Sequence, residues 1–291
     1  MKTTITNRLA RSNLLVALTL VLGCSSSPTN ISEESPPQKS TVEYVDELLA
    51  SAQTQSGSAA AELTLQALET MLNAGFIERA QLEAEQHNLS VDIPSDLRLR
   101  YLMVRAQLDL QSGHIESALQ WLRSPPASEM DTMSEPGRNY FLLLGDTLMA
   151  LGETTAAIQA YVSSSITAPK NETPVLFEKL WIALTDLDDE NLANLASLAT
   201  TYELRGWVEL ARIVRIDEFS IRSQLDSIAQ WRRVWARHSA VNQLPEALVR
   251  LQQTWNQRPS HIALILPLQQ PAGNAIQEGF LSAYYQALEI S

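Results

Sequence analysis

The sequence is poor in the residues from which most active sites and metal centres are built. It has one cysteine, Cys24, and four histidines among 291 residues, and the histidines stand in none of the spacings typical of metal ligands. A single cysteine also excludes an internal disulfide. The motifs G-x-S-x-G, the P-loop and G-x-G-x-x-G are absent. The sequence therefore predicts a protein that is not an enzyme and that has no cofactor and no metal.

Basic residues are also scarce. The chain has 21 lysines and arginines against 33 acidic residues, a net charge of −12, which argues against binding nucleic acid by bulk attraction. The apolar run from Leu14 to Leu22 is too short to cross a bilayer as a resident helix. Because Lys2, Arg8 and Arg11 precede this run, we predict that residues 1–23 are a signal peptide.

The run ends in Val21-Leu22-Gly23-Cys24, which resembles the lipobox of bacterial lipoproteins, where the cysteine receives a lipid and everything before it is removed. The alternative is an ordinary secretory signal followed by a chance cysteine. Ser25 stands where an aspartate would signal retention in the inner membrane. We therefore predict a lipid on Cys24 that anchors the protein on the periplasmic face of the outer membrane.

Residues 24–41 are rich in serine, proline and glutamate and contain one large apolar residue, Ile31. Such a segment cannot bury enough apolar surface to order itself. We predict a disordered tether that joins the lipidated cysteine to a folded domain.

A helix-turn-helix pattern recurs in the next part of the chain. Apolar residues at helical spacing flank Gly75, Gly113 and Gly152, which follow one another at intervals of 38 and 39 residues. A repeat of this length indicates stacked helix pairs, because one pair cannot bury its own apolar stripe. Five positions after each glycine stands an alanine, namely Ala80, Ala118 and Ala157.

This arrangement resembles the tetratricopeptide (TPR) family, in which a glycine and an alanine let paired helices approach closely. The period of that family is nearer 34 residues, and its tryptophan and proline signposts are missing here. We therefore predict a mainly α fold, a TPR-like array of stacked helical hairpins over residues 42–258. The alternative is an irregular all-helical domain with incidental periodicity.

Several later helix boundaries follow from local signals. Thr173-Pro174 and Leu244-Pro245 are typical helix starts, and residues 186–189 should form a turn before the next helix. Arg205-Gly206 is expected to end a helix. The body shows no alternation with period two, so a β-sheet is not expected there.

Charge is uneven along this domain. Residues 24–203 carry nine basic and 26 acidic side chains, whereas residues 204–258 carry nine arginines and five acidic side chains. The arginines interleave with tryptophans, a mixture that suits contact with an anionic polymer or a partner protein. The alternative is that the tryptophans are core and the arginines a solvated face. The candidate partner-contact patch consists of Trp207, Arg212, Arg215, Arg232, Arg233 and Arg237.

The pattern changes at His261. Residues 262–266 form a continuous apolar run, a loop follows, and apolar residues at helical spacing start at Ile276. This order predicts a strand, a loop and a helix, which would open an α/β sheet buried on both faces. Because one parallel strand needs partners, residues 259–291 are expected to be the incomplete start of a domain.

The order of these segments and one sharp motif resemble the LpoA family of outer-membrane lipoproteins, which activate a bifunctional class A penicillin-binding protein. That family has an I-A-L-L-L-P-L-S-G-P run before a helix that ends in G-F-L-A-A-Y-Y. Here Gln269-Gln270-Pro271 replaces Ser-Gly-Pro, and residues 279–285 read GFLSAYY. The resemblance implies that residues 259–291 begin a periplasmic-binding-protein-like α/β domain, which is the part that docks on the synthase.

The resemblance also implies a function. We predict a non-catalytic regulator of peptidoglycan synthesis that reaches across the periplasm to activate a class A penicillin-binding protein, with the helical array as a spacer. Since most of the docking domain is expected to be absent, this chain is not expected to activate the synthase by itself. The alternative is a solute-binding lipoprotein whose helices are an accessory domain.

Overall fold

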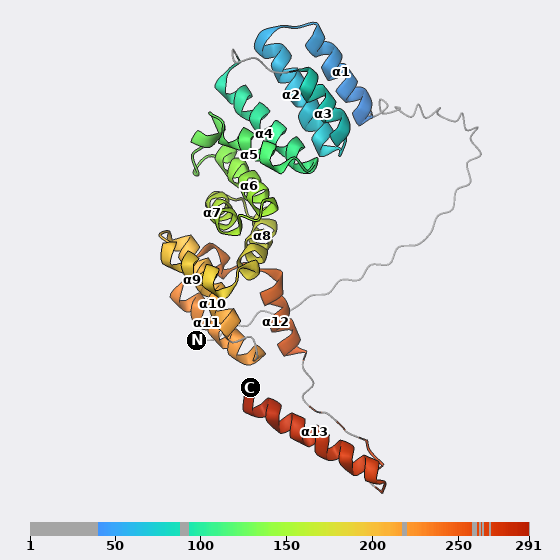
Figure 1. Ribbon diagram of the computed structural model, residues 1–291, viewed down its shortest axis with the longest axis vertical. Helices are drawn as coiled ribbons and strands as arrows, with labels where there is room; N and C mark the ends of the chain where they lie inside the picture. Colours follow the sequence, from blue (N-terminus) through green and yellow to red (C-terminus); the bar gives the residue numbers. More distant parts are fainter. Residues whose placement is uncertain are drawn as a thin grey trace, which may run out of the picture. The chain divides into compact units, whose positions relative to one another are not determined.

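The computed structural model describes residues 40–87, 93–216, 220–257, 261, 263, 265–267 and 269–290. Within these residues every regular element is helical, as the mainly α prediction expects (Figure 1). In chain order the elements are α1 (Thr41–Gln53), α2 (Gly57–Asn73), α3 (Ile77–Gln86), α4 (Ser95–Gln111), α5 (Ile115–Arg123), the short 3-10 turn η1 (Ala127–Glu129), α6 (Glu135–Ala150), α7 (Thr154–Ser165), α8 (Thr173–Asp186), α9 (Asp189–Leu198), α10 (Tyr202–Ile216), α11 (Ile221–Val234), the 3-10 turn η2 (Ser239–Val241), α12 (Glu246–Asn256) and α13 (Pro271–Ile290).

Three helix pairs, α2–α3, α4–α5 and α6–α7, are joined by the same turn. Gly75, Gly113 and Gly152 each have a left-handed backbone, with φ of 77°, 81° and 78°. The amide after each glycine donates to the carbonyl five positions earlier, which is the Schellman closure of a helix end. These bonds join Phe76 N to Met71 O (2.9 Å), His114 N to Asp109 O (2.8 Å) and Glu153 N to Leu148 O (2.9 Å). The predicted turn glycines are confirmed, and glycine is needed because this φ strains other residues.

The alanines that follow the turns are fully buried. Ala80, Ala118 and Ala157 have no exposed surface. Within each pair the two helices pack on each other, and the first helices of successive pairs also pack, α2 on α4 and α4 on α6. The prediction of stacked helical hairpins is therefore confirmed for this part of the chain.

A larger residue at Ala118 should destabilise the stack. Ala118→Leu adds three carbons at a position with no exposed surface, and overpacking of this kind costs about 1–3 kcal/mol. The urea midpoint followed by circular dichroism should fall accordingly. Gln120→Leu, an exposed position on the same helix, is the control and should leave the midpoint nearly unchanged. An unaltered midpoint in Ala118→Leu would show that this repeat is not close-packed.

The apolar core follows the stack in three clusters. One joins α1 to α4, a second joins α4 to α6, and a third runs from α5 to α12. α4, α5 and α6 each contribute to two clusters, so neighbouring units share a wall. This is how units that cannot bury their own stripes become stable together.

The expectation that Arg205-Gly206 ends a helix is wrong. α10 runs through both residues, and the break before it lies at residues 199–201. The ring of His238 lies against Gly206, so that a Cβ on this glycine would come within 2.2 Å of His238 Cδ2. Gly206 therefore marks a close approach between two segments and not a turn.

Other predicted boundaries are confirmed. α8 begins at Thr173 with proline in its first turn, and Pro245 immediately precedes α12. In the turn at residues 186–189, Asp188 caps α9 by accepting a hydrogen bond from Asn191 N at 2.7 Å. A carboxylate at this position stabilises the helix start by satisfying a free amide.

The C-terminal segment contains the predicted helix, α13. Two residues of the predicted strand, Ile262 and Leu264, lie outside the described residues, and Ala263, Ile265 and Leu266 belong to no regular element. Among the helices that the structure describes, none combines the length and apolar character needed to cross a membrane.

Candidate functional site

The residue predicted to carry a lipid, Cys24, lies outside the described residues, as do the signal peptide and all but the last two residues of the tether. Lipid attachment therefore stays a prediction from the sequence.

The six residues of the candidate partner-contact patch do not all lie on the surface. Trp207 has no exposed surface and its ring lies edge-on to Phe177, with centroids 4.9 Å apart. It cannot form part of a contact surface, because it is in the core. Arg215 is already engaged within the protein, because it forms an ion pair with Asp189 at 2.8 Å and donates to the carbonyls of Thr185 and Leu187.

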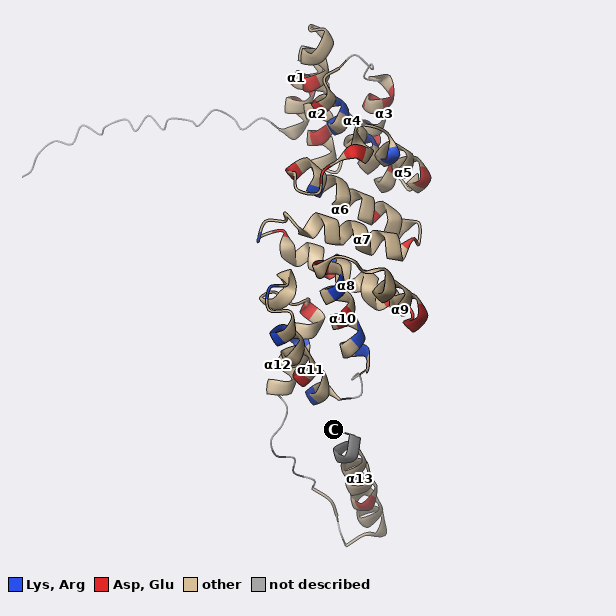
Figure 2. Ribbon diagram, turned by 90° about the vertical axis from the view of Figure 1, so that its left-hand side faces the viewer, with Lys and Arg blue, Asp and Glu red and all other residues tan. Residues whose placement is uncertain are grey.

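The remaining arginines of the patch are more accessible. Arg212, Arg233 and Arg237 are exposed, and none of them has an ion pair with another described residue. Arg232 is partly buried, and within the described part of the chain its Nε has no hydrogen-bond partner. Figure 2 shows several basic positions along α10, α11 and α12. The cationic character predicted for this end is thus present, and it comes from the arginines alone.

His238 lies at the centre of an aromatic cluster next to this patch. Its ring centroid is 5.1–6.2 Å from those of Tyr202, Trp207, Trp231 and Trp235. Nε2 donates to the carbonyl of Glu203 at 2.9 Å, and Nδ1 accepts from Ala240 N at 3.2 Å. Both nitrogens are satisfied only in the neutral ring, and burial lowers the pKa of His238 although the carbonyl and carboxylate of Glu203 oppose this.

The protein should therefore lose stability as the pH falls below about 6.5, the ordinary pKa of histidine. Between that value and the lowered pKa of folded His238, the unfolded chain binds more protons than the folded one, so acidification favours unfolding. Urea midpoints measured from about pH 7.5 to about pH 5.5 should show this slope. His238→Gln should flatten it, whereas His114→Gln, at an exposed site, should not. The same slope in His238→Gln and the wild type would contradict the assignment.

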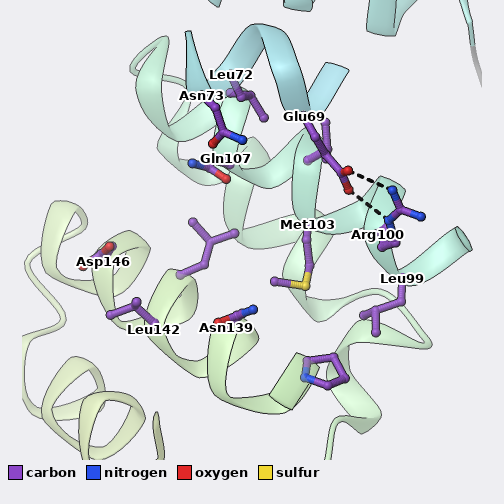
Figure 3. A pocket seen from close by; sticks show the side chains of 13 residues that line it. Glu69, Leu72, Asn73, Leu99, Arg100, Met103, Gln107, Asn139, Leu142 and Asp146 are labelled. Atoms are coloured by element: carbon purple, nitrogen blue, oxygen red, sulfur yellow. Dashed lines mark hydrogen bonds and ion pairs between the residues drawn. The ribbon is translucent and has the colours of Figure 1, made fainter. Parts of the chain in front are cut away.

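A groove crosses the first helices of three successive pairs (Figure 3). Its volume is about 480 Å³, within the usual range for ligand sites. Buried leucine and valine side chains form its base, and carboxylate, guanidinium and amide groups stand around it. The lining residues are Glu69, Leu72 and Asn73 of α2, Leu99, Arg100, Met103, Val104 and Gln107 of α4, and Pro136, Asn139, Leu142, Leu143 and Asp146 of α6.

One end of the groove carries a three-membered ion network. The guanidinium of Arg100 binds Glu69 through two hydrogen bonds of 2.9 and 2.8 Å, and it binds Glu62 through a third of 2.7 Å. The hydrogen bond with Glu69 is the main reason that the pKa of Arg100 is raised. Arg100 is therefore always charged, and it shares its one positive charge between two carboxylates.

Asp146 lies at the opposite end from the Glu69 and Arg100 pair (Figure 3). It accepts from the hydroxyl of Tyr161 at 2.8 Å and from the ammonium of Lys179 at 2.5 Å. Burial, followed by the charge of Asp146, raises the pKa of Tyr161, so that this hydroxyl stays a donor. These contacts tie α6 to α7 and α8 and fix the carboxylate in place.

Three amide side chains complete the groove. Asn73, Gln107 and Asn139 are exposed, and none makes a side-chain hydrogen bond with another residue in the described ranges. Each amide offers donors and an acceptor. The groove thus presents hydrogen-bonding groups and charge over an apolar base, which suits binding. Among the described residues there is also no cluster of His, Cys, Asp or Glu that could hold a metal ion.

The groove is not among the sites predicted from the sequence, although the repeat contains a signal for it. Polar residues occupy the same two positions in each repeat, six and thirteen residues before the turn glycine. Since seven residues are close to two helical turns, the two positions share a face. The residues are Glu69, Gln107 and Asp146 at the nearer position, and Glu62, Arg100 and Asn139 at the farther one.

Comparison with known proteins gives a consistent family. The model described as "LppC putative lipoprotein" matches residues 38–289. The chain is similar to the penicillin-binding protein activator LpoA of Photobacterium profundum (23% identical over 273 residues, 92% of this chain and 44% of the relative). It is also similar to LpoA of Edwardsiella ictaluri (25% over 279 residues, 93% of this chain and 39% of the relative). The chain thus spans less than half the length of these relatives.

Solved structures show the same fold. The amino-terminal domain of E. coli LpoA superposes with a TM-score of 0.59 at 16% identity, covering 78% of this chain and 94% of that domain. The N-terminal domain of Haemophilus influenzae LpoA superposes with a TM-score of 0.57 at 16% identity, covering 74% and 93%. With the family model matching most of the chain, this protein belongs to the LppC lipoprotein family.

Proposed function

We propose that this chain acts in a non-catalytic lipoprotein regulator that activates a class A penicillin-binding protein and so promotes peptidoglycan synthesis. The observation that carries the proposal is the alignment of more than nine tenths of the chain with relatives named penicillin-binding protein activator LpoA. The stacked helix pairs support it, because such arrays supply extended binding surfaces. The relatives' names support the regulator rather than a solute-binding lipoprotein.

In this proposal each segment has a task. A lipid on Cys24 anchors the chain to the outer membrane, residues 24–41 are the tether, and the array at 42–258 spans part of the periplasm. Residues 259–291 lead into a periplasmic-binding-protein-like α/β domain. The exposed apolar residues of α13 support the last assignment, since a helix of such a domain needs an apolar face to pack on a sheet. These residues are Ile276, Leu281, Tyr284 and Tyr285.

The anchor is tested by Cys24→Ala. Without the thiol no lipid can be attached, so the protein should leave the outer-membrane fraction almost completely and accumulate as a soluble or uncleaved form. Ser25→Asp is the matched control, because it keeps the lipid and should move the protein to the inner membrane. A wild-type protein found without lipid and soluble in the periplasm would contradict the assignment.

The regulatory role is tested by deleting the gene in the organism that carries it. Glycan-chain polymerisation and crosslinking by the class A synthase should fall in the deletion strain and recover with the wild-type gene, but not with Cys24→Ala. Unchanged peptidoglycan synthesis together with reduced uptake of a small solute would instead support the solute-binding alternative.

A further inference from the structure

We propose that the groove across α2, α4 and α6 binds an extended peptide segment of a partner protein, in which a basic side chain lies between apolar ones. This inference does not depend on the activator role. It rests on the dimensions of the groove, on its unused amide groups and on its charge.

The dimensions fit a short peptide. Three adjacent packed helices, with axes about 8–10 Å apart, span about 20 Å. An extended chain rises about 3.3 Å per residue, so the groove accommodates about six residues. The groove of about 480 Å³ is lined by residues from all three helices, so an extended segment that crosses them would contact each helix. Met103, at its centre, is a flexible side chain that adapts to different apolar partners (Figure 3).

The amide groups fit a peptide backbone. Asn73, Gln107 and Asn139 come from three different helices and line one groove, so they follow the direction in which a bound segment would run. A carboxamide donates to a carbonyl and accepts from an amide at the same time, which is the pattern that an extended backbone presents. In the described part of the chain these side chains are not engaged elsewhere.

The negative charge of the groove favours a basic side chain on the bound peptide. Among the charged residues that line the groove, two carboxylates, Glu69 and Asp146, stand against one cation, Arg100. Outside the lining, Glu62 pairs with Arg100 and Lys179 pairs with Asp146, so these five groups together also carry one excess negative charge. The surrounding chain is also acidic, with 17 acidic residues, six arginines and no lysine between residues 41 and 165. A lysine or arginine on the partner supplies the missing positive charge, whereas an acidic segment is repelled.

The proposal can be tested with an immobilised library of hexapeptides in which all positions are varied. The purified chain from residue 25 to 291 should retain peptides that carry one lysine or arginine flanked by leucine, isoleucine, valine or methionine. Binding should weaken as salt is raised. Retention of acidic peptides, or of none, would overturn the proposal.

Variants then locate the bound peptide. Gln107→Ala together with Asn139→Ala should weaken binding of a selected peptide by about tenfold, the effect of losing hydrogen bonds that net about 1.4 kcal/mol. Glu69→Gln should reduce the preference for lysine over norleucine at the same peptide position. Gln107 and Asn139 are exposed, whereas Glu69 is half-buried in its ion pair with Arg100. Circular dichroism therefore checks that each variant is folded before its binding is measured.

Gln120→Ala is the matched control. It removes an exposed amide from α5, a helix that does not line the groove, and it should bind the selected peptide as tightly as the wild type. Equal binding by the Gln107→Ala, Asn139→Ala double variant and the control would place the peptide elsewhere on the molecule and contradict the proposal.

Discussion

Gly206→Ala is expected to destabilise the protein by about 3 kcal/mol, the upper part of the range for overpacking. The new methyl carbon would lie 2.2 Å from His238 Cδ2 and 2.6 Å from Nε2. The ring cannot move away easily, because Trp207 and Trp231 stand edge-on to it. Moving it would also break its hydrogen bond to the carbonyl of Glu203. The indole N–H of Trp231 donates a hydrogen bond of 2.9 Å to the carbonyl of Gly206, so the backbone at this glycine is fixed too.

The loss should be visible as a lower urea midpoint and as a change in the near-ultraviolet circular dichroism of the tryptophans. Gly279→Ala in α13 is the control, since a Cβ added to this glycine would have no other atom within 4 Å and alanine favours a helix by about 1 kcal/mol over glycine. It should leave the array unchanged. If Gly206→Ala unfolds at the same midpoint as the wild type, the close approach to His238 is not as tight as the structure has it.

The two kinds of glycine show what the sequence can predict. Gly75 and its counterparts were predictable as turns, because a positive φ at a helix end has a local cause and recurs at a fixed interval. The role of Gly206 was not predictable, because glycine is required there by the ring of His238, a residue that follows α11 in the chain. A contact between segments distant in the chain has no local signature, so the default interpretation of Arg205-Gly206 as a helix end was wrong.

The residues of the candidate patch also differ in whether the sequence could predict their role. Composition predicts that the segment from residue 204 is cationic, and the exposed Arg212 is consistent with it. Composition cannot tell that Arg215, one helical turn further, is engaged by Asp189 and two carbonyls. The groove is an intermediate case, since its polar positions are periodic in the sequence but become a site only when α2, α4 and α6 pack side by side.

Trp207→Ala is expected to destabilise the protein by about 3–5 kcal/mol. The indole has no exposed surface and packs against Phe177 and His238. Its removal would leave a cavity in the cluster that joins α8, α10 and α11, and that cluster continues to α12. Urea unfolding of the variant, followed by circular dichroism, measures the loss.

Matched variants separate the core role of Trp207 from a role in partner contact. Trp207→Phe should cost much less than Trp207→Ala, because phenylalanine keeps most of the volume and removes an indole N–H that has no hydrogen-bond partner in the described part of the chain. Arg212→Ala and Arg233→Ala, at exposed positions, should change the free energy of unfolding by less than about 0.5 kcal/mol. If Trp207→Ala were as stable as these arginine variants, the indole would not be part of the core. The patch predicted from the sequence would then have to be restored, with the tryptophan among its contact residues.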